Sequence, residues 1–303
     1  MAKEKTKLEK LNYFRILFQG VITFVSNSYI VGFIKGKIYQ GNIKSVCFPG
    51  LNCYSCPGAI GSCPIGSLQA SLGSRGRKSA FYVGGLLASY GLVGGRFICG
   101  WLCPFGWIED LLFKIPFVKK VRKLPFEAYL EKIRYLVLII LVLLLPAVLR
   151  DITGLGKPFF CSYACPKGTL SGLFLMAANP PLRSIAGSLF AWKLSLLIVT
   201  IIASIIIYRP FCRYICPLGA IYGLFNKVSL YHFEIDTSKC SGCALCQEAC
   251  KLDINVFENP NSSACIRCRD CIAACPYDSI KERFKIQDVV KNASDYQVSA
   301  SNH

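Results

Sequence analysis

The sequence predicts an α-helical membrane protein of about four transmembrane helices with cysteine-rich loops, followed by a small α+β domain. Apolar residues make up 53% of the 303 residues, and they are concentrated before Leu230. Runs such as 135–149 and 192–208 are nearly uncharged, and with their flanks they approach the roughly 20 residues needed to span a bilayer. The composition then turns polar, as expected for a separate domain.

The helices are predicted in chain order. A short, lysine-rich cytoplasmic N-terminus, residues 1–12, precedes an apolar run that is too long for a signal peptide and lacks a convincing cleavage site. Basic residues at 119–123 mark the cytoplasmic face, so both termini are predicted inside. Residues 107–118 are too short to cross and contain Glu109 and Asp110, so we place them at the membrane interface. The four predicted spans are residues 13–34, 79–98, 133–149 and 191–208.

One cysteine motif occurs twice, as RFICGWLCPFG over 96–106 and as RPFCRYICPLG over 209–219. In each copy two cysteines lie four residues apart, on the same face of a helical turn. A [4Fe–4S] cluster needs four thiolates, so the copies are predicted to meet and to bind one inner cluster. The predicted ligands are Cys99, Cys103, Cys212 and Cys216. Alternatively, each pair is structural. Arg96 and Arg209 either stabilise the cluster or extend to the membrane surface.

A longer repeat surrounds this motif, about 13–118 and 133–228 within a transmembrane cluster-binding domain at 13–230. Each half consists of a helix, an outer loop that contains Cys-Pro-x-Gly, a second helix and an inner Cys-x-x-x-Cys-Pro-x-Gly motif. The outer loops contain six cysteines, two more than one cluster needs. We predict that Cys56, Cys63, Cys161 and Cys165 bind an outer cluster and that Cys47 and Cys53 are further ligands or a disulfide. Disulfides throughout the outer loops are the alternative.

Residues 231–285 contain the strongest signal. The cysteines follow the bacterial two-cluster ferredoxin pattern, in which the fourth cysteine of each run binds the other cluster. One cluster is therefore predicted on Cys240, Cys243, Cys246 and Cys275, and the other on Cys265, Cys268, Cys271 and Cys250. Lys251 stands where the pattern usually has proline. A zinc site would leave surplus thiols. Residues 286–303 form a polar tail.

These motifs resemble the membrane polyferredoxin family that includes the NapH subunit of periplasmic nitrate reduction and the C-terminal part of the nitrous-oxide reduction protein NosR. The resemblance covers roughly residues 10–285 and depends on the two Cys-x-x-x-Cys-Pro motifs and the eight cysteines from Cys240 to Cys275. It implies electron transfer between a quinol pool or cytoplasmic donor and an acceptor across the membrane. The six outer cysteines depart from the simplest members.

The charge and motifs exclude several functions. The formal net charge of +18 first suggests nucleic acid, but four bound clusters would remove about 8 of these units, and no nucleic-acid module is present. The remaining basic excess fits cytoplasmic loops of a multi-pass protein in a bacterial or archaeal cytoplasmic membrane. No phosphate loop or nucleophile constellation indicates a hydrolase or transferase.

We therefore predict an electron-transfer protein without bond-making chemistry of its own. Electrons would pass from a cytoplasmic ferredoxin or flavoprotein to an extracytoplasmic flavoprotein or reductase. The alternative is a quinol dehydrogenase subunit. His232 is a poor candidate for the proton acceptor that quinone chemistry needs, and Trp101, Phe105 and Trp107 could line a quinone slot. A third possibility is a redox-sensing or maturation protein.

Overall fold

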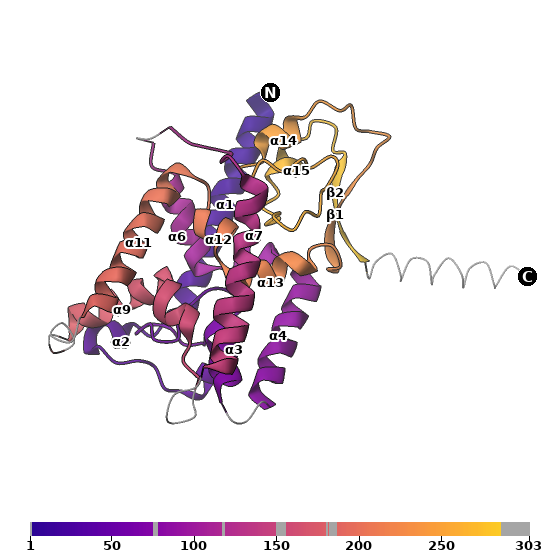
Figure 1. Cartoon of the computed structure of the whole chain (residues 1–303). Coiled ribbons are helices and arrows are strands. Elements are labelled where there is room, and N and C mark those ends of the chain that lie inside the picture. Colours follow the sequence, from indigo (N-terminus) through magenta and orange to yellow (C-terminus); the bar gives the residue numbers. More distant parts are fainter. Residues whose placement is uncertain are drawn as a thin grey trace, which may run out of the picture.

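The computed structural model describes residues 2–74, 78–116, 119–149, 156–179, 181 and 187–285 (Figure 1). The first half of the chain contains α1 (Ala2–Ser26), α2 (Ile30–Lys35), η1 (Asn42–Ser45), α3 (Pro64–Gly73), α4 (Lys78–Gly94), α5 (Phe97–Trp101) and α6 (Pro104–Phe113). The second half contains α7 (Glu127–Val137), η2 (Leu138–Leu144), α8 (Leu145–Val148), η3 (Phe160–Ala164), α9 (Pro166–Ala178), α11 (Ser188–Ile206), α12 (Pro210–Tyr214) and α13 (Pro217–Phe225). The chain continues with β1 (Tyr231–Ile235), α14 (Leu245–Ala249), α15 (Asp270–Ala274) and β2 (Ile280–Phe284).

The two halves present the same order of elements and pack into each other. In each half a helix that begins at Cys-Pro (α3, α9) precedes a long helix (α4, α11), a one-turn helix (α5, α12) and a second Cys-Pro helix (α6, α13). The last helix of each half packs on the long helix of the other half, α6 on α11 and α13 on α4. Likewise α3 contacts η2 and α8, and α9 contacts α2. The halves therefore share one core.

The Cys-Pro pairs explain where four of these helices begin. Each helix has proline at its first position and the preceding cysteine as an extended N-cap residue. Proline is favoured there because its fixed φ suits a helix and its missing N–H would have no intrahelical partner. Backbone N–H groups of this first turn remain free to donate to the cysteine sulfur. The four N-cap residues are Cys63, Cys103, Cys165 and Cys216.

The predicted four transmembrane helices are wrong. Among the described residues, α11 is the one helix that is both long and apolar enough to cross a membrane. The predicted span 13–34 is interrupted, because α1 ends at Ser26 and α2 is a separate six-residue helix. The apolar helix at 79–94 is too short. The run at 133–149 lies in a continuous helical stretch in which π-helical residues Leu138–Leu144 join α7 to α8, and this stretch is not among the candidate spans. Apolar composition did not reveal the break after Ser26.

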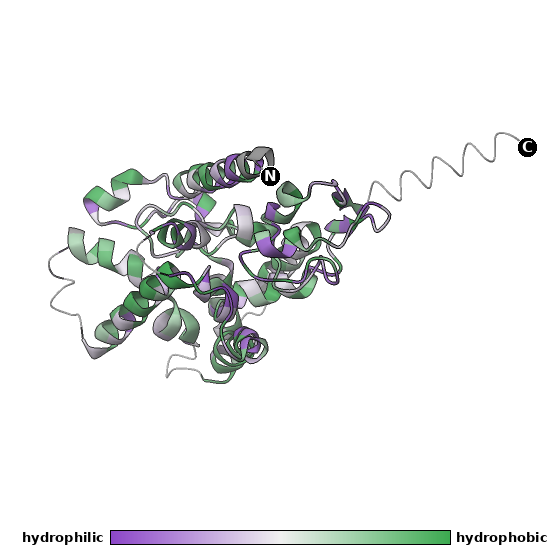
Figure 2. Cartoon of the chain, turned by 90° about the horizontal axis from the view of Figure 1, so that it is seen from above, coloured by the Kyte–Doolittle hydropathy of each residue, from purple (hydrophilic) through white to green (hydrophobic). Residues whose placement is uncertain are grey.

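The surface of the helical region is nevertheless apolar. Helix α11 has a mean hydropathy of 2.3 over its best window, of which only 11% is buried inside the protein. Large apolar side chains are also exposed on α1, α4 and α7, among them Phe24, Phe81 and Leu136. Figure 2 shows most of the helices in the colours of apolar residues. Exposed apolar surface of this extent is typical of an interaction with lipid or with another protein.

The ferredoxin-like region, residues 231–285, is built on one antiparallel pair of strands. Tyr231 pairs with Phe284 and Ile235 with Ile280, so β1 and β2 bring the two ends of the region together. The cysteine loops and the short helices α14 and α15 lie between the strands in sequence. Helix α1 packs against α15, and the N-terminus lies beside this region in Figure 1. The predicted polar tail lies outside the described residues.

Candidate iron–sulfur sites

The two copies of the repeated motif meet in the structure and form what we call the inner site. Cys212 makes side-chain hydrogen bonds with Cys99 and with Cys216. Cys103 lies close enough to Cys212 to interact with it electrostatically. All four thiols are buried. The two halves thus supply two cysteines each, as the duplicated motif predicts, while their role as ligands stays a prediction.

Two arginines bind across the inner site. Arg96 Nη2 donates to the carbonyl oxygen of Cys212 at 2.9 Å, and Arg209 Nη1 donates to the carbonyl oxygen of Cys99. Each motif therefore places its arginine on the cysteine of the other copy. Both side chains are only 1% exposed, so they do not extend to a membrane surface. Their role is to tie the two halves together.

Glycine makes room for this crossing. A Cβ at Gly106 would lie 3.1 Å from Arg209 Nη1, and a Cβ at Gly219 would lie 3.2 Å from Arg96 Nη2. Both contacts are tighter than an ordinary van der Waals approach. The Cys-Pro-x-Gly pattern of the inner motifs thus has a steric reason, because a larger residue would push the opposite arginine out of place.

Arg96 and Arg209 differ in whether a carboxylate balances their charge. Arg209 forms two hydrogen bonds with Asp110, at 2.7 and 2.6 Å, and Arg15 lies 3.4 Å from the same carboxylate. Burial alone would raise the pKa of Asp110, but Arg209 and Arg15 outweigh it and lower the pKa to about 2. The neighbouring Glu109 accepts from the Phe211 N–H at 3.0 Å. Glu109 and Asp110, which were predicted to lie at the membrane interface, are buried against the second motif.

Arg96 and two further buried arginines have neutral partners. Arg96 also donates to the Ser263 and Ala264 carbonyl oxygens, both at 3.0 Å. Among the described residues, Arg96, Arg134 and Arg267 show hydrogen bonds to carbonyl, hydroxyl or amide oxygens and no ion pair with a carboxylate. Burying a charge is costly unless an opposite charge lies nearby. A cluster core of about +2 on four thiolates carries about −2. Arg96 interacts electrostatically with Cys99 and Cys212, and Arg267 with Cys265, so these two guanidinium groups fit sites that hold such an anionic group.

The eight cysteines of the ferredoxin-like region divide into the two predicted sets. The first set lines a cavity of about 230 Å³ and consists of Cys240, Cys243, Cys246 and Cys275. The second set lines a smaller, more closed cavity and consists of Cys250, Cys265, Cys268 and Cys271. The fourth cysteine of each run thus lies with the other run. Cys243 is exposed, so the first set lies at the surface, whereas the second set lies beside Tyr208 and the inner site.

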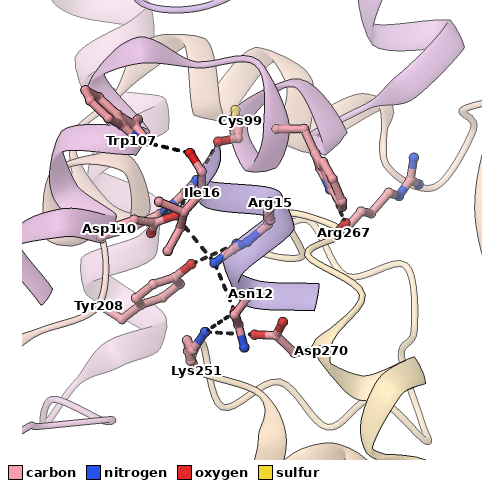
Figure 3. A network of polar contacts seen from close by, with 12 residues as sticks. Asn12, Arg15, Ile16, Cys99, Trp107, Asp110, Tyr208, Lys251, Arg267 and Asp270 are labelled. Carbon is pink, nitrogen blue, oxygen red and sulfur yellow. Dashed lines mark hydrogen bonds and ion pairs between the residues drawn. The ribbon is translucent and has the colours of Figure 1, made fainter. Parts of the chain in front are cut away.

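A polar network joins the second set to the inner site (Figure 3). Lys251 Nζ lies 3.0 Å from Asp270 Oδ2 and donates to Asn12 Oδ1 at 2.8 Å. Arg15, one turn further along α1, donates to the Tyr208 hydroxyl at 3.2 Å and pairs with Asp110. Lys251, at the position where the ferredoxin pattern usually has proline, therefore anchors the ferredoxin-like region to α1. A proline there could make neither contact.

The outer loops bring together a different set of four cysteines from the predicted one. Cys53, Cys63, Cys161 and Cys165 line one cavity of about 190 Å³, which we call the outer cavity. Cys56 is buried elsewhere in the loop and does not line it. Cys47 lies near Tyr90, whose hydroxyl donates to the Cys47 carbonyl oxygen at 3.3 Å. All 18 cysteines fall within the described residues and none is bridged, so the structure contains neither the Cys47–Cys53 disulfide nor an outer disulfide set.

The described cysteine side chains do not gather around one point. Within the described residues no three cysteine, histidine, aspartate or glutamate side chains converge on the position of a single metal ion. A cubane binds each thiolate through a separate iron, so its four ligands stay apart. The zinc alternative requires four ligands about 2.3 Å from one ion, and the described residues do not offer that arrangement.

The proposed quinone-slot residues are engaged in packing. Trp101 Nε1 donates to the Arg267 carbonyl oxygen and Trp107 Nε1 to the Ile16 carbonyl oxygen, both at 3.0 Å. Phe105 packs edge-on against Phe211. His232 contacts the Leu230 carbonyl oxygen and Glu234. Sequence reasoning missed Arg15, Asp110, Gln69 and Lys193 as residues around the sites; a buried charge in an otherwise apolar segment was the available signal for the first two.

Comparison with known proteins agrees with this chemistry. The family model described as "4Fe-4S binding domain" matches residues 79–125, 134–177 and 189–235. Two uncharacterized proteins of Methanocaldococcus jannaschii are 29% and 30% identical over 60% and 62% of the chain, and the matches span 62% and 72% of those proteins. The ferredoxin-type protein NapH of Haemophilus influenzae is 27% identical over 61% of each chain. No solved structure matches.

Part of a longer protein also matches this chain. The regulatory protein NosR of Pseudomonas aeruginosa is 25% identical over 61% of this chain, although the match spans only 24% of NosR. The cysteine sets, the buried cationic side chains and the matching family model identify an iron–sulfur protein of the [4Fe–4S] type. The predicted resemblance is confirmed: the chain belongs to the polyferredoxin family of NapH-like and NosR-like proteins.

Proposed function

We propose that this protein is a membrane-bound electron conduit between a cytoplasmic ferredoxin or flavoprotein and an acceptor on the opposite side of the membrane. An extracytoplasmic flavoprotein or reductase is the class of acceptor. The observation that carries the proposal is the serial order of the cysteine sets. The set with the exposed Cys243 comes first, the set beside Tyr208 second, and the inner site third.

The chain's own residues favour this order. When bound, the [4Fe–4S] clusters would accept and release single electrons. Tyr208 lines the cavity of the second set and stands next to Arg209, which bonds to Cys99 of the inner site. The ferredoxin-like region contacts the inner site through arginine side chains and backbone carbonyl groups. Arg96, Arg134 and Arg267 in this contact are all at most 1% exposed, so water is excluded from it. Both sites are therefore held at fixed separation by one packed interface.

The membrane part of the proposal depends on the apolar surface. Helix α11 has 19 residues, which corresponds to a length of about 28 Å, close to the hydrocarbon thickness of a bilayer. The basic residues near 120 are engaged at the ferredoxin-like region: Lys123 lies 2.6 Å from Asp253, and Arg122 donates to the Glu248 carbonyl oxygen. This places positive charge and the ferredoxin-like region on one side, which we assign to the cytoplasm.

The quinol alternative is less well supported. The groove that best suits an aromatic headgroup among the described residues lies between α4 and the strand pair and is lined by Phe97, Tyr231, Arg269, Glu282 and Phe284 among others. Its polar groups already bind each other: the Tyr231 hydroxyl donates to Glu282 at 2.7 Å, and Arg269 pairs with the same carboxylate. A quinone would have to break these contacts to be held through its oxygens.

The test uses the full chain, loaded with clusters and inserted into sealed vesicles without quinone. A reductant is supplied on the side of the ferredoxin-like region, and a membrane-impermeant oxidant is enclosed on the other side. We expect the enclosed oxidant to be reduced. The variant Cys99→Ser, which removes one predicted ligand of the inner site, is expected to stop this transfer while the clusters of the ferredoxin-like region still become reduced.

Two outcomes would contradict the proposal. Reduction of the oxidant only after quinone is added would support a quinol dehydrogenase subunit instead. Full reduction of every cluster with no transfer under either condition would favour a redox sensor or a maturation protein. Vesicles that contain Cys243→Ser serve as the control for electron entry at the exposed set.

A further inference from the structure

We infer that the outer cavity is a fourth [4Fe–4S] site whose ligands are Cys53, Cys63, Cys161 and Cys165, with Cys53 and not Cys56 as the fourth ligand. This inference builds on the proposed function, because it extends the series of sites by one step beyond the inner site. It also assigns the two remaining cysteines, Cys47 and Cys56, to packing of the outer loop.

The first support is the convergence of four thiols from both halves of the chain. Cys53 lies in the loop before α3, and Cys63 is the N-cap residue of that helix. Cys161 lies in η3, and Cys165 is the N-cap residue of α9. Cys63, Cys161 and Cys165 each interact electrostatically with Cys53. Since all four also line the same cavity of about 190 Å³, they enclose one space and not two separate pairs.

The second support is the set of donors aimed at the sulfur atoms. Backbone N–H groups of Ile65 and Gly66 donate to Cys63, as those of Lys167 and Gly168 do to Cys165. Gln69 Nε2 donates to Cys161 Sγ at 3.4 Å, and its Oε1 is fixed by the Phe160 N–H at 3.0 Å. Hydrogen bonds to sulfur stabilise anionic cluster ligands.

Positive charge completes the cavity. Lys167 and Lys193 line it, and Lys193 Nζ donates to the Cys161 carbonyl oxygen at 3.3 Å. Lys167 is only 7% exposed, which is unusual for a lysine with no carboxylate in its cavity lining. Four thiolates around a cubane core would carry about −2. The two ammonium groups therefore match the charge of the proposed ligand.

A short segment connects this cavity to the inner site. The Leu51 N–H donates to Cys103 Sγ at 3.4 Å, and the Leu51 side chain lines the outer cavity together with Cys53. Two residues of extended chain span at most roughly 7 Å. Tyr222 lies between the same two regions, with its hydroxyl on the Pro49 carbonyl oxygen at 2.8 Å. One electron leaving the inner site could therefore be accepted at the outer one, so that the first is oxidised as the second is reduced.

The experiment counts iron in the full chain after anaerobic expression and purification in detergent. The wild type is expected to hold about sixteen irons, four for each cluster. Cys53→Ser is expected to lose about four of them, as are Cys63→Ser and Cys165→Ser. Cys56→Ser is the matched control, because it changes a buried thiol three residues away in the same loop and should keep all sixteen. The electron paramagnetic resonance signals of the ferredoxin-like region report whether each variant is folded.

The outcomes separate this inference from the proposed function. A wild-type count of about twelve, with Cys99→Ser losing four, rejects the outer site and leaves the three-site conduit intact, even if the outer variants do not fold. A count of sixteen in which Cys56→Ser loses iron and Cys53→Ser does not would overturn the ligand assignment. A wild type from which Cys99→Ser removes no iron contradicts the proposed function itself.

Discussion

The inner and outer sites use the same Cys-Pro helix start but are built differently around it. At the inner site the counter-charges are arginines that cross between the halves and bond to the backbone of the opposite motif. At the outer site they are lysines beside a cavity that retains solvent contact, since Cys53 and Cys161 are only partly buried. The four inner cysteines are all buried in the core that joins the halves, whereas two of the four outer cysteines, Cys63 and Cys165, belong to that core and the other two lie at its edge.

This difference follows from the chemistry of the two cations. Arginine presents a planar fork of five donors and keeps its charge when buried, so it can hold two backbones in register. Lysine is a point charge on a flexible stem and suits a site near water. We therefore expect damage at the inner site to affect the stability of the whole protein, and damage at the outer site to remain local.

The largest expected effect is that of Asp110→Asn. The change leaves Arg209 and Arg15 buried without their shared carboxylate, which typically costs about 3–5 kcal/mol. The measurement is the free energy of unfolding in detergent by denaturant titration. The control is Asp253→Asn, which breaks a pair with the exposed Lys123 and should cost at most about 1 kcal/mol.

Asp110→Asn also tests how the free energy of unfolding depends on pH. The pKa of Asp110 falls from 3.8 to about 2 on folding, so its contribution to stability is present above about pH 4 and is lost as the pH falls towards 2. The stability difference between wild type and Asp110→Asn should therefore stay constant from pH 7 to pH 5. A difference that disappears in this range would show that the carboxylate is not held ionised by the two arginines.

An intermediate effect is expected from Arg96→Gln. Arg96 has no carboxylate partner among the described residues, so its loss removes a whole positive charge beside the inner thiols. Adding an electron to an anionic cluster then becomes harder by about 1–4 kcal/mol. The midpoint potential of the inner signal should shift downward, and Arg96→Lys should shift it less. An equal shift of the outer signal would show that the two sites are not electrostatically separate.

The smallest effect is expected from Gln69→Met, which preserves volume but removes the hydrogen bond to Cys161 Sγ. The loss of one such bond is worth about 1 kcal/mol, so the outer signal should move to lower potential while iron content and the inner signal stay unchanged. Gln19→Met is the control, because Gln19 is equally buried but its side-chain amide has no hydrogen-bond partner within the part of the chain that the structure describes. An unchanged outer signal in Gln69→Met would show that the Gln69 amide does not influence the outer site.

The sequence by itself determined the features that depend on short spacing. Cysteines three or four residues apart must share a turn or a loop, so the two ferredoxin sets and the inner pairs could be proposed from their motifs, and the family resemblance followed from the same residues. Duplication of the Arg-x-x-Cys-x-x-x-Cys-Pro motif also indicated that the copies meet, since neither copy alone offers four thiols.

Only the tertiary structure decided which distant residues meet. The choice between Cys53 and Cys56 depends on how one irregular loop folds over η3, and three residues of chain give no preference between them. The partners of Arg96, Arg209 and Asp110 lie about a hundred residues away. The number of long apolar helices was also misjudged from composition, because hydropathy alone did not show where the first apolar run breaks or where the helix at 79–94 ends. Local spacing is fixed by covalent geometry, whereas long-range pairing is fixed by the packing of the whole chain.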